Sequence, residues 1–263
     1  MAHHTTFPRL LSPSLVAAIA GLAAVLGICA PVRAEPLTVG APPSLRPALI
    51  EILPMFEREY DAPVQIVYTP SKTLVREIEN GASIDVLLTG GVDEIEYLHK
   101  KGLTLNGKPR IYARTSLVLV MSTNSSAALL SLDDALQSRT TRIVLGDPHT
   151  SSLGEISARA LAKINPTYKT HANILYAPHS EDIIQLIRTG KADVGLVYRV
   201  DTINSGQVRI SDGTPIGSQV PIQFGQAVVS TCRPALRPVA ERFSDFLMTP
   251  RIQKLLVKYG FDP

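Results

Sequence analysis

The chain has 263 residues, a formal net charge of +3 at pH 7 and only 5% aromatic residues. It contains no basic run and few aromatic side chains on which bases could stack, so we expect no nucleic-acid partner. The length suits one large domain or two small ones.

The first 34 residues have the pattern of a secretory signal peptide. Arg9 precedes an apolar run at about 15–30, and small residues precede Glu35. The run is shorter than the roughly 20 residues that span a bilayer, which disfavours a membrane anchor. The bulky Ile28 before Cys29 disfavours lipoprotein processing. We therefore expect cleavage near Glu35, a periplasmic location and a mature net charge of +1, because two Arg residues leave with the leader.

Short apolar segments alternate with amphipathic ones along most of the mature chain, which predicts strands followed by helices. The expected strands are 36–41, 64–69, 84–89, 116–122, 142–147, 173–177, 193–198 and 220–230. The expected helices are 44–59, 71–80, 92–101, 152–164 and 180–188, followed by two C-terminal helices, the second of which has Thr249 as its N-cap and Pro250 at its first position. Residues 204–219 are rich in turn-forming residues. The alternation indicates an α/β fold with mostly parallel sheets flanked by helices.

Two segments of the chain resemble each other. Both "REIENGASIDVLL" and "QLIRTGKADVGLV" end a helix at a glycine and enter a strand through an aspartate. The glycines, Gly81 and Gly190, are expected to be left-handed caps, and Asp85 and Asp193 to be turn formers. The similarity predicts two lobes, with residues 35–115 plus 223–263 in lobe I and 116–222 in lobe II. In such folds ligands bind beyond the carboxyl ends of the strands.

Hydroxyl groups recur at the predicted strand-to-helix junctions. Ser44, Ser71 and Ser180 stand at helix starts, the loop at 146–155 contains several more, and Tyr198 ends a strand. Each serine alone is explained by helix capping. Recurrence in several loops instead favours a cleft for an anion or a polar small molecule, because free amides and helix dipoles at these junctions attract negative charge.

Catalytic motifs are scarce in this sequence. The chain has no G-x-S-x-G, H-E-x-x-H, Walker or Rossmann glycine motif. His149, His171 and His179 lie in separate loops, and Glu181 and Asp182 suit a first helical turn. We therefore expect no enzyme, no cofactor and no metal cation. Cys232 is the only cysteine of the mature chain, so no internal disulfide is expected.

Several longer stretches, in this order, resemble one known family. They are "APPSLRPAL", "PSKTLVREIENGASIDVLL", "GDPHTSSLGEISARALAKI", "APHSEDI", "ADVGLVYRVD" and "FLMTPRIQKLLVKYGF". Together they make residues 36–262 similar to the periplasmic molybdate- and tungstate-binding proteins of ABC importers. The resemblance implies a two-lobed type II periplasmic-binding fold, a ligand cleft between the lobes, an inner-membrane permease as partner and, we expect, a monomer.

The resemblance also implies a set of ligand-binding residues. In that family two serines, a few backbone amides and a tyrosine hydroxyl hold the oxyanion without a metal cation. The matching positions are the hydroxyls of Ser44 and Ser71, the amides of Leu153 and Ile183, and the phenol of Tyr198.

The chain departs from the family pattern at several of these positions. Pro42 and Pro43 replace the usual alanines, Leu153 is larger than the usual alanine, and Lys72 stands where a small hydroxyl residue is usual. Lys72 is therefore a possible additional ligand residue. These departures leave open a receptor for another anion, such as a sulfate-like oxyanion or an organic carboxylate. A periplasmic enzyme on the same scaffold and a sensor subunit are further alternatives.

Overall fold

The computed structural model describes residues 35–105, 107–124, 131–203, 205–206, 208–211 and 221–262. The predicted signal peptide lies outside these residues, as does most of the turn-rich stretch. The chain from Glu35 onward forms one compact unit. Within the described part, no helix is both long and apolar enough to cross a membrane.

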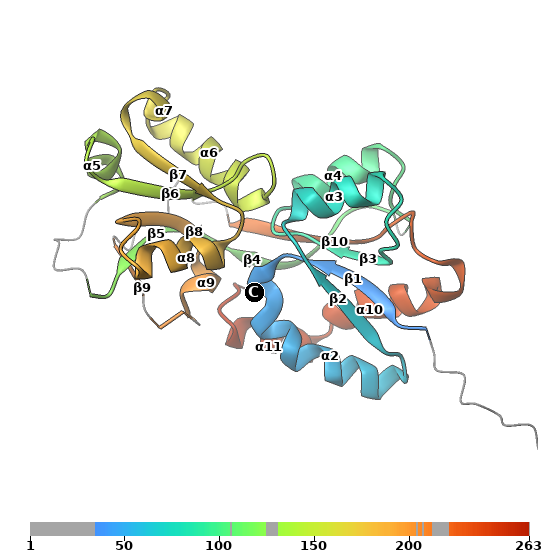
Figure 1. Cartoon of the computed structure of the whole chain (residues 1–263). Helices are drawn as coiled ribbons and strands as arrows, with labels where there is room; N and C mark the ends of the chain where they lie inside the picture. The colour runs from blue at the N-terminus through green and yellow to red at the C-terminus, as the bar shows by residue number, and fades with distance from the viewer. Residues whose placement is uncertain are drawn as a thin grey trace, which may run out of the picture. The chain divides into compact units, whose positions relative to one another are not determined.

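The first sheet has the strand order β2-β1-β3-β10-β4. Its strands are β1 (Leu37–Ala41), β2 (Val64–Tyr68), β3 (Val86–Leu88), β4 (Arg110–Thr115) and β10 (Ile222–Val228). The helices of this half are η1 (Pro43–Leu45), α2 (Arg46–Tyr60), α3 (Ser71–Glu79), α4 (Asp93–Lys100), η2 (Pro234–Leu236), α10 (Arg237–Leu247) and α11 (Pro250–Lys258). Helices α3 and α4 cover one face of the sheet, and α2, α10 and α11 lie on the other (Figure 1). We call this half lobe I.

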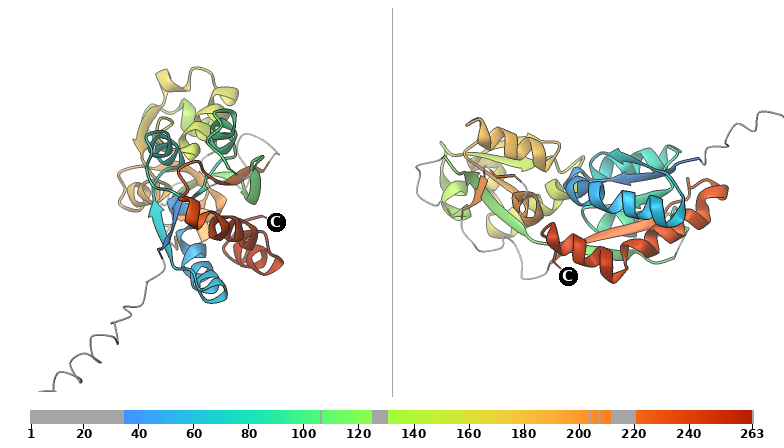
Figure 2. Two further views of the ribbon diagram at one scale, coloured as in Figure 1. Left: turned by 90° about the vertical axis from the view of Figure 1, so that its right-hand side faces the viewer. Right: turned by 90° about the horizontal axis from the view of Figure 1, so that it is seen from below.

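The second sheet has the order β7-β6-β8-β5-β9 and forms lobe II. Its strands are β5 (Leu117–Ser122), β6 (Arg142–Gly146), β7 (Asn173–Ala177), β8 (Val194–Tyr198) and β9 (Val208–Ile210). Its helices are α5 (Leu132–Gln137), α6 (Ser152–Ile164), α7 (Tyr168–His171), α8 (Ser180–Arg188) and α9 (Arg199–Ile203). Helix α6 packs on one face and α8 on the other, and the turned views show the same layers (Figure 2).

The predicted α/β, two-lobed class is confirmed, with one correction to the sheets. Each described sheet has two parallel and two antiparallel pairings, so neither is mostly parallel. The antiparallel pairings come from β4, β5, β9 and β10. Strand β4 was not predicted from the sequence, and the residues of β9 lie within the stretch predicted to be turn-rich. The chain passes from the first sheet to the second between Thr115 and Leu117 and is back in the first sheet from Ile222.

The two similar segments occupy equivalent places in the two lobes. Gly81 and Gly190 have φ angles of 83° and 69°, so both are the expected left-handed caps. Asp85 accepts a hydrogen bond from the Thr38 amide of β1 at 2.8 Å. Asp193 accepts one from the Arg142 amide of β6 at 2.7 Å. The aspartates thus tie together parallel strands of each sheet, which is a more specific role than turn formation.

Cys232 lies close to the first of these aspartates. Its thiol is buried, with 6% of the residue exposed. Burial, and then the nearby Asp85 carboxylate, raise the pKa of Cys232 to about 12. The thiol is therefore protonated and unreactive at neutral pH.

Candidate functional site

Three serines at the predicted junctions stand inside their helices, one or two positions after the N-cap. Proline occupies the N-cap before Ser71, and His179 occupies the N-cap before Ser180. Ser44 lies within the short helix η1, whose N-cap is Pro42. None of the three helices has a side-chain cap hydrogen bond. The simple explanation that these serines are caps is therefore wrong, and their hydroxyls remain available for other contacts.

Ser71 and Tyr198 meet at Gly90, which follows strand β3. The Gly90 amide donates to Ser71 Oγ at 3.0 Å, and the Tyr198 hydroxyl donates to the Gly90 carbonyl oxygen at 2.8 Å. A Cβ atom at Gly90 would lie 3.0 Å from the Tyr198 oxygen, so glycine allows this close approach. Burial raises the pKa of Tyr198 well above its usual range, so the phenol is neutral. The Tyr198 contact joins lobe II to lobe I.

The Leu153 amide lies in the first turn of helix α6. Ser151 is the N-cap of α6, and its hydroxyl accepts a hydrogen bond from the Gly154 amide at 3.0 Å. Leu153 is therefore the second residue of the helix, where the amide has no partner within the helix. A Cβ atom at Gly154 would lie 2.3 Å from the backbone of Asp147, so only glycine lets this loop fold against the helix start.

Ile183 is not placed as the resemblance implies. Because the N-cap of α8 is His179 and not Ser180, Ile183 is the fourth residue of the helix. Its amide donates to the His179 carbonyl oxygen at 3.1 Å, and its side chain is fully buried. A shift of one residue in the helix start thus commits this amide to the helix. Among the residues of α8, the amides that have no partner within the helix at this end are those of Ser180, Glu181 and Asp182.

Lys72 is also turned away from the predicted ligand position. Its ammonium group forms an ion pair with Glu155 and donates to the Pro148 carbonyl oxygen at 2.9 Å. Both partners belong to lobe II, whereas Lys72 lies in helix α3 of lobe I. The side chains of the ion pair are 28% and 38% exposed. Lys72 therefore links the lobes at the rim of the site.

The remaining predicted residues line one small cavity of about 30 Å³. Around it converge the starts of η1, α3, α6 and α8 and the end of β8. Its walls are Pro42, Pro43, Ser44, Pro70, Ser71, Gly90, Ser151, Ser152, Leu153, Pro178, His179, Ser180 and Tyr198. We call it the hydroxyl pocket. Thus Ser44, Ser71, Leu153 and Tyr198 are brought together, whereas Ile183 and Lys72 do not line it.

Two residues of this pocket were not recognised as site residues from the sequence. The Ser180 hydroxyl lies 3.2 Å from the Ser44 hydroxyl, so these two residues meet across the lobes. His179 Nδ1 is buried and, within the described part of the chain, has no hydrogen-bond partner. The repeated pattern of a proline shortly before each serine was the available signal for Ser180, because the pocket also contains Pro42, Pro70 and Pro178.

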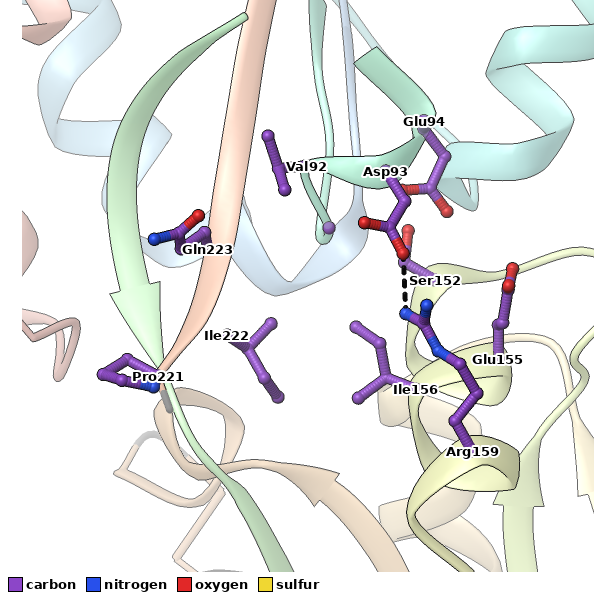
Figure 3. A pocket seen from close by; sticks show the side chains of 11 residues that line it. Val92, Asp93, Glu94, Ser152, Glu155, Ile156, Arg159, Pro221, Ile222 and Gln223 are labelled. Atoms are coloured by element: carbon purple, nitrogen blue, oxygen red, sulfur yellow. Dashed lines mark ion pairs between the residues drawn. The ribbon is translucent and has the colours of Figure 1, made fainter. Parts of the chain in front are cut away.

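A second, larger cavity of about 290 Å³ adjoins the hydroxyl pocket through Ser152. Figure 3 shows Arg159 of α6 directed towards Asp93 of α4, and this ion pair measures 2.7 Å. Glu94 also lines the cavity but is only 7% exposed, and its Oε2 has no partner among the described residues. Burial raises the pKa of Glu94 to about 7, an effect that the nearby Ser152 hydroxyl partly offsets.

Comparison with protein families identifies the family to which this chain belongs. Residues 37–262 match the family model described as bacterial extracellular solute-binding protein. The chain belongs to this family. This solute-binding protein is 25% identical over 233 residues to the molybdate-binding protein ModA of Escherichia coli. The alignment covers 86% of this chain and 88% of ModA.

Solved structures show the same fold. The solute-binding protein superposes on the periplasmic molybdate-binding protein of Azotobacter vinelandii with a TM-score of 0.72 and 18% identity, covering 86% of this chain and 99% of that one. It superposes on the sulfate-binding protein SubI of Mycobacterium tuberculosis with a TM-score of 0.70 and 19% identity, covering 87% of each. Among its described residues, no three His, Cys, Asp or Glu side chains are grouped to hold a metal ion.

Proposed function

We propose that this protein is the periplasmic receptor of an ABC importer and that it binds molybdate or tungstate in the hydroxyl pocket. The ligand groups are the hydroxyls of Ser44 and Ser71 and the amide of Leu153, to which we add the Ser180 hydroxyl. Tyr198 lines the pocket but donates its proton to the Gly90 carbonyl oxygen. The single observation that carries the proposal is the composition of the pocket wall, whose described residues offer hydroxyls and amides and include no Asp, Glu, Lys or Arg.

Such a wall suits a small, fully ionised oxyanion. Many directed N–H and O–H donors replace the hydration shell of the anion, and helices α3, α6 and α8 direct the positive ends of their dipoles at it. A carboxylate wall would repel the anion, and a metal cation is not required. The similarity to molybdate-binding proteins supports this choice of anion.

The size of the pocket favours an inorganic ion over an organic carboxylate. Pockets for organic ligands of drug size usually measure roughly 300 Å³ or more. The hydroxyl pocket measures about 30 Å³, which is room for only a few atoms. Sulfate is the second candidate, because the fold is shared with a sulfate-binding protein.

Binding couples to closure of the lobes. Ser44 and Ser71 belong to lobe I, and Leu153 and Ser180 belong to lobe II. An anion held by both sets binds the closed form better than an open one, so it shifts the population towards closure. The closed receptor, which we propose is a monomer, would then deliver the anion to an inner-membrane permease.

Thermal unfolding with different anions tests the proposal. The purified protein is heated with molybdate, tungstate, sulfate, phosphate or small carboxylates. A ligand at about 100 times its dissociation constant adds roughly 2.7 kcal/mol to the free energy of unfolding. We expect a raised melting temperature with molybdate and tungstate. A response to sulfate alone would reassign the ligand, and no response to any anion would refute the proposal.

A further inference from the structure

Asp201 lies directly behind the hydroxyl pocket. It is the third residue of helix α9, three positions after Tyr198. It lines a cavity of about 260 Å³, and its Oδ2 atom is buried without a hydrogen-bond partner among the described residues. Burial raises the pKa of Asp201 to about 7, while the hydroxyls of Ser44 and Ser180 favour its ionised form.

Ser44 and Ser180 form the partition between the two cavities. Both residues line the hydroxyl pocket, and both line the cavity that contains Asp201. Their hydroxyl oxygens are 3.2 Å apart, and either can be the donor. A chain of hydrogen-bonding groups therefore runs from Asp201 through two serines to the place where we expect the oxyanion.

The protons in this chain can be counted. Each serine has one proton to donate, an ionised carboxylate can only accept, and a protonated carboxyl group can donate. When Asp201 is ionised, the serine protons point towards it, and oxygen lone pairs face the hydroxyl pocket. When Asp201 is protonated, it donates to a serine, and the serine protons are free to point into the pocket.

We propose that Asp201 is the residue that selects the charge state of the bound oxyanion. Its protonated form makes Ser44 and Ser180 donors for a fully ionised oxyanion, and its ionised form makes them acceptors for an oxyanion that carries its own proton. This inference rests on the proposed function. Binding of a dianion at a pH where Asp201 is ionised then requires uptake of one proton from the solvent, and no covalent bond changes.

The charged groups around Asp201 do not neutralise it. Glu181 of α8 faces it and raises its pKa, and Arg188 of α8 lines the same cavity. Arg46 of α2 lies 3.6 Å from Glu181, and Arg199 of α9 lies 3.5 Å from Asp262. Of the strands that pack against α9, β9 contributes Arg209, whereas β5 and β8 contain no Asp, Glu, Lys or Arg. Among the described residues, the ion pairs of Arg46 and Arg199 are therefore with Glu181 and Asp262, not with Asp201.

Calorimetry of molybdate binding tests the proposal. Titrations of the purified protein at about pH 6 and about pH 8, each in two buffers of different ionisation enthalpy, give the number of protons taken up. We expect little uptake at the lower pH and nearly one proton per molybdate from Asp201 at the higher pH. Affinity should fall about tenfold per pH unit above the pKa of Asp201. Binding at pH 8 without proton uptake would overturn the proposal.

Two variants assign the proton. Asp201→Asn keeps the shape of the side chain but cannot titrate. The molybdate affinity of this variant should therefore not change with pH, and the variant should take up no proton when it binds molybdate at about pH 8. Glu94→Gln is the matched control, because Glu94 also has a buried carboxyl oxygen without a partner among the described residues and a pKa raised to about 7. The Glu94→Gln variant should still take up a proton on binding molybdate. Uptake that persists in Asp201→Asn, or that disappears only in Glu94→Gln, rejects the assignment to Asp201.

The outcomes separate this inference from the proposed function. If molybdate, tungstate and sulfate fail to bind at every pH, the receptor function itself is refuted. If an anion binds without proton exchange, only the role of Asp201 is refuted. Should Asp201→Asn fail to fold, infrared difference spectra of Glu94→Gln on addition of molybdate at about pH 8 decide the question. Gain of a protonated carboxyl band supports Asp201, and its absence rejects it.

Discussion

The hydroxyl of Tyr198 in lobe II donates its proton to the carbonyl oxygen of Gly90 in lobe I across 2.8 Å. A phenol has only one proton, so in this form Tyr198 offers the pocket an oxygen lone pair, not a donor. The contact is buried on both sides. It follows that Tyr198 stabilises the closed arrangement of the lobes directly.

Tyr198→Phe should therefore weaken oxyanion binding. The substitution leaves the Gly90 carbonyl buried without its partner. This costs about 1 to 3 kcal/mol, which corresponds to a loss of roughly 5- to 150-fold in affinity. Calorimetric titration with molybdate measures this loss of affinity. Tyr112→Phe is the control, because the buried Tyr112 hydroxyl donates to the Thr89 carbonyl oxygen within lobe I at 3.3 Å. It should lower thermal stability but leave affinity unchanged. Equal affinities of Tyr198→Phe and the wild type would contradict the cross-lobe role.

Ser71→Ala tests the direct contact to the anion. Ser71 Oγ accepts from the Gly90 amide, so its own proton is free for the ligand. Loss of a hydrogen bond to a charged group costs about 1.5 to 3 kcal/mol, and molybdate affinity should fall accordingly. The matched control is Ser157→Ala, since Ser157 is also fully buried but does not line the pocket. An unchanged affinity in Ser71→Ala would remove this residue from the site.

Lys72 and Glu155 provide a third prediction. Their ion pair spans the lobes but is partly exposed, so we expect it to contribute less than about 1 kcal/mol to closure. Lys72→Met and Glu155→Gln should each weaken molybdate binding by less than about fivefold, and the double variant should be no weaker than either single one. The effects should shrink as salt is added. A loss for Lys72→Met as large as that of Ser71→Ala, with additive effects, would instead make Lys72 a ligand residue.

Glu94 should make the stability of the protein depend on pH. The pKa of its carboxyl group is about 7 in the folded protein and about 4.3 in an unfolded chain. Between these values the folded protein holds a proton that the unfolded chain releases. The free energy of unfolding should therefore fall as pH rises from about 4.5 to about 7, by up to about 3 kcal/mol from this group, and stay level above that range.

Denaturant unfolding of Glu94→Gln across this pH range measures the contribution. The variant should be less sensitive to pH than the wild type, although Asp201 keeps part of the dependence. Glu96→Gln is the control, because Glu96 is an exposed residue of the same helix. A wild-type pH profile in Glu94→Gln would show that Glu94 titrates normally in the folded state.

The general plan of the molecule could be read from the sequence because it depends on local patterns. The strand and helix alternation predicted the two sheets and the loops that form the pocket, and helix α6 spans the predicted residues 152–164. Strand β4 was missed because "RIYART" contains two arginines and shows no regular alternation of polar and apolar residues. Its pairing with β10, far away in the chain, places it in the sheet.

The finer features of the site depend on contacts that the sequence does not display. Serine is a better cap than histidine in general, so placing Ser180 at the N-cap was reasonable, yet His179 takes that position and Ile183 loses its free amide. Lys72 was considered a possible ligand residue because it follows Ser71. The sequence could not reveal its ion pair, because its partner Glu155 is far away in the chain. Asp201 had no visible role until the fold placed it behind Ser44 and Ser180.

The buried thiol of Cys232 makes lobe closure easy to observe. In a chain that begins at Glu35 it is the only cysteine, and at neutral pH it should not react with maleimide reagents. One new cysteine on the exposed surface of each lobe would then accept fluorescent dyes selectively. Energy transfer between the dyes could follow opening and closing on single molecules, without removal of the natural cysteine.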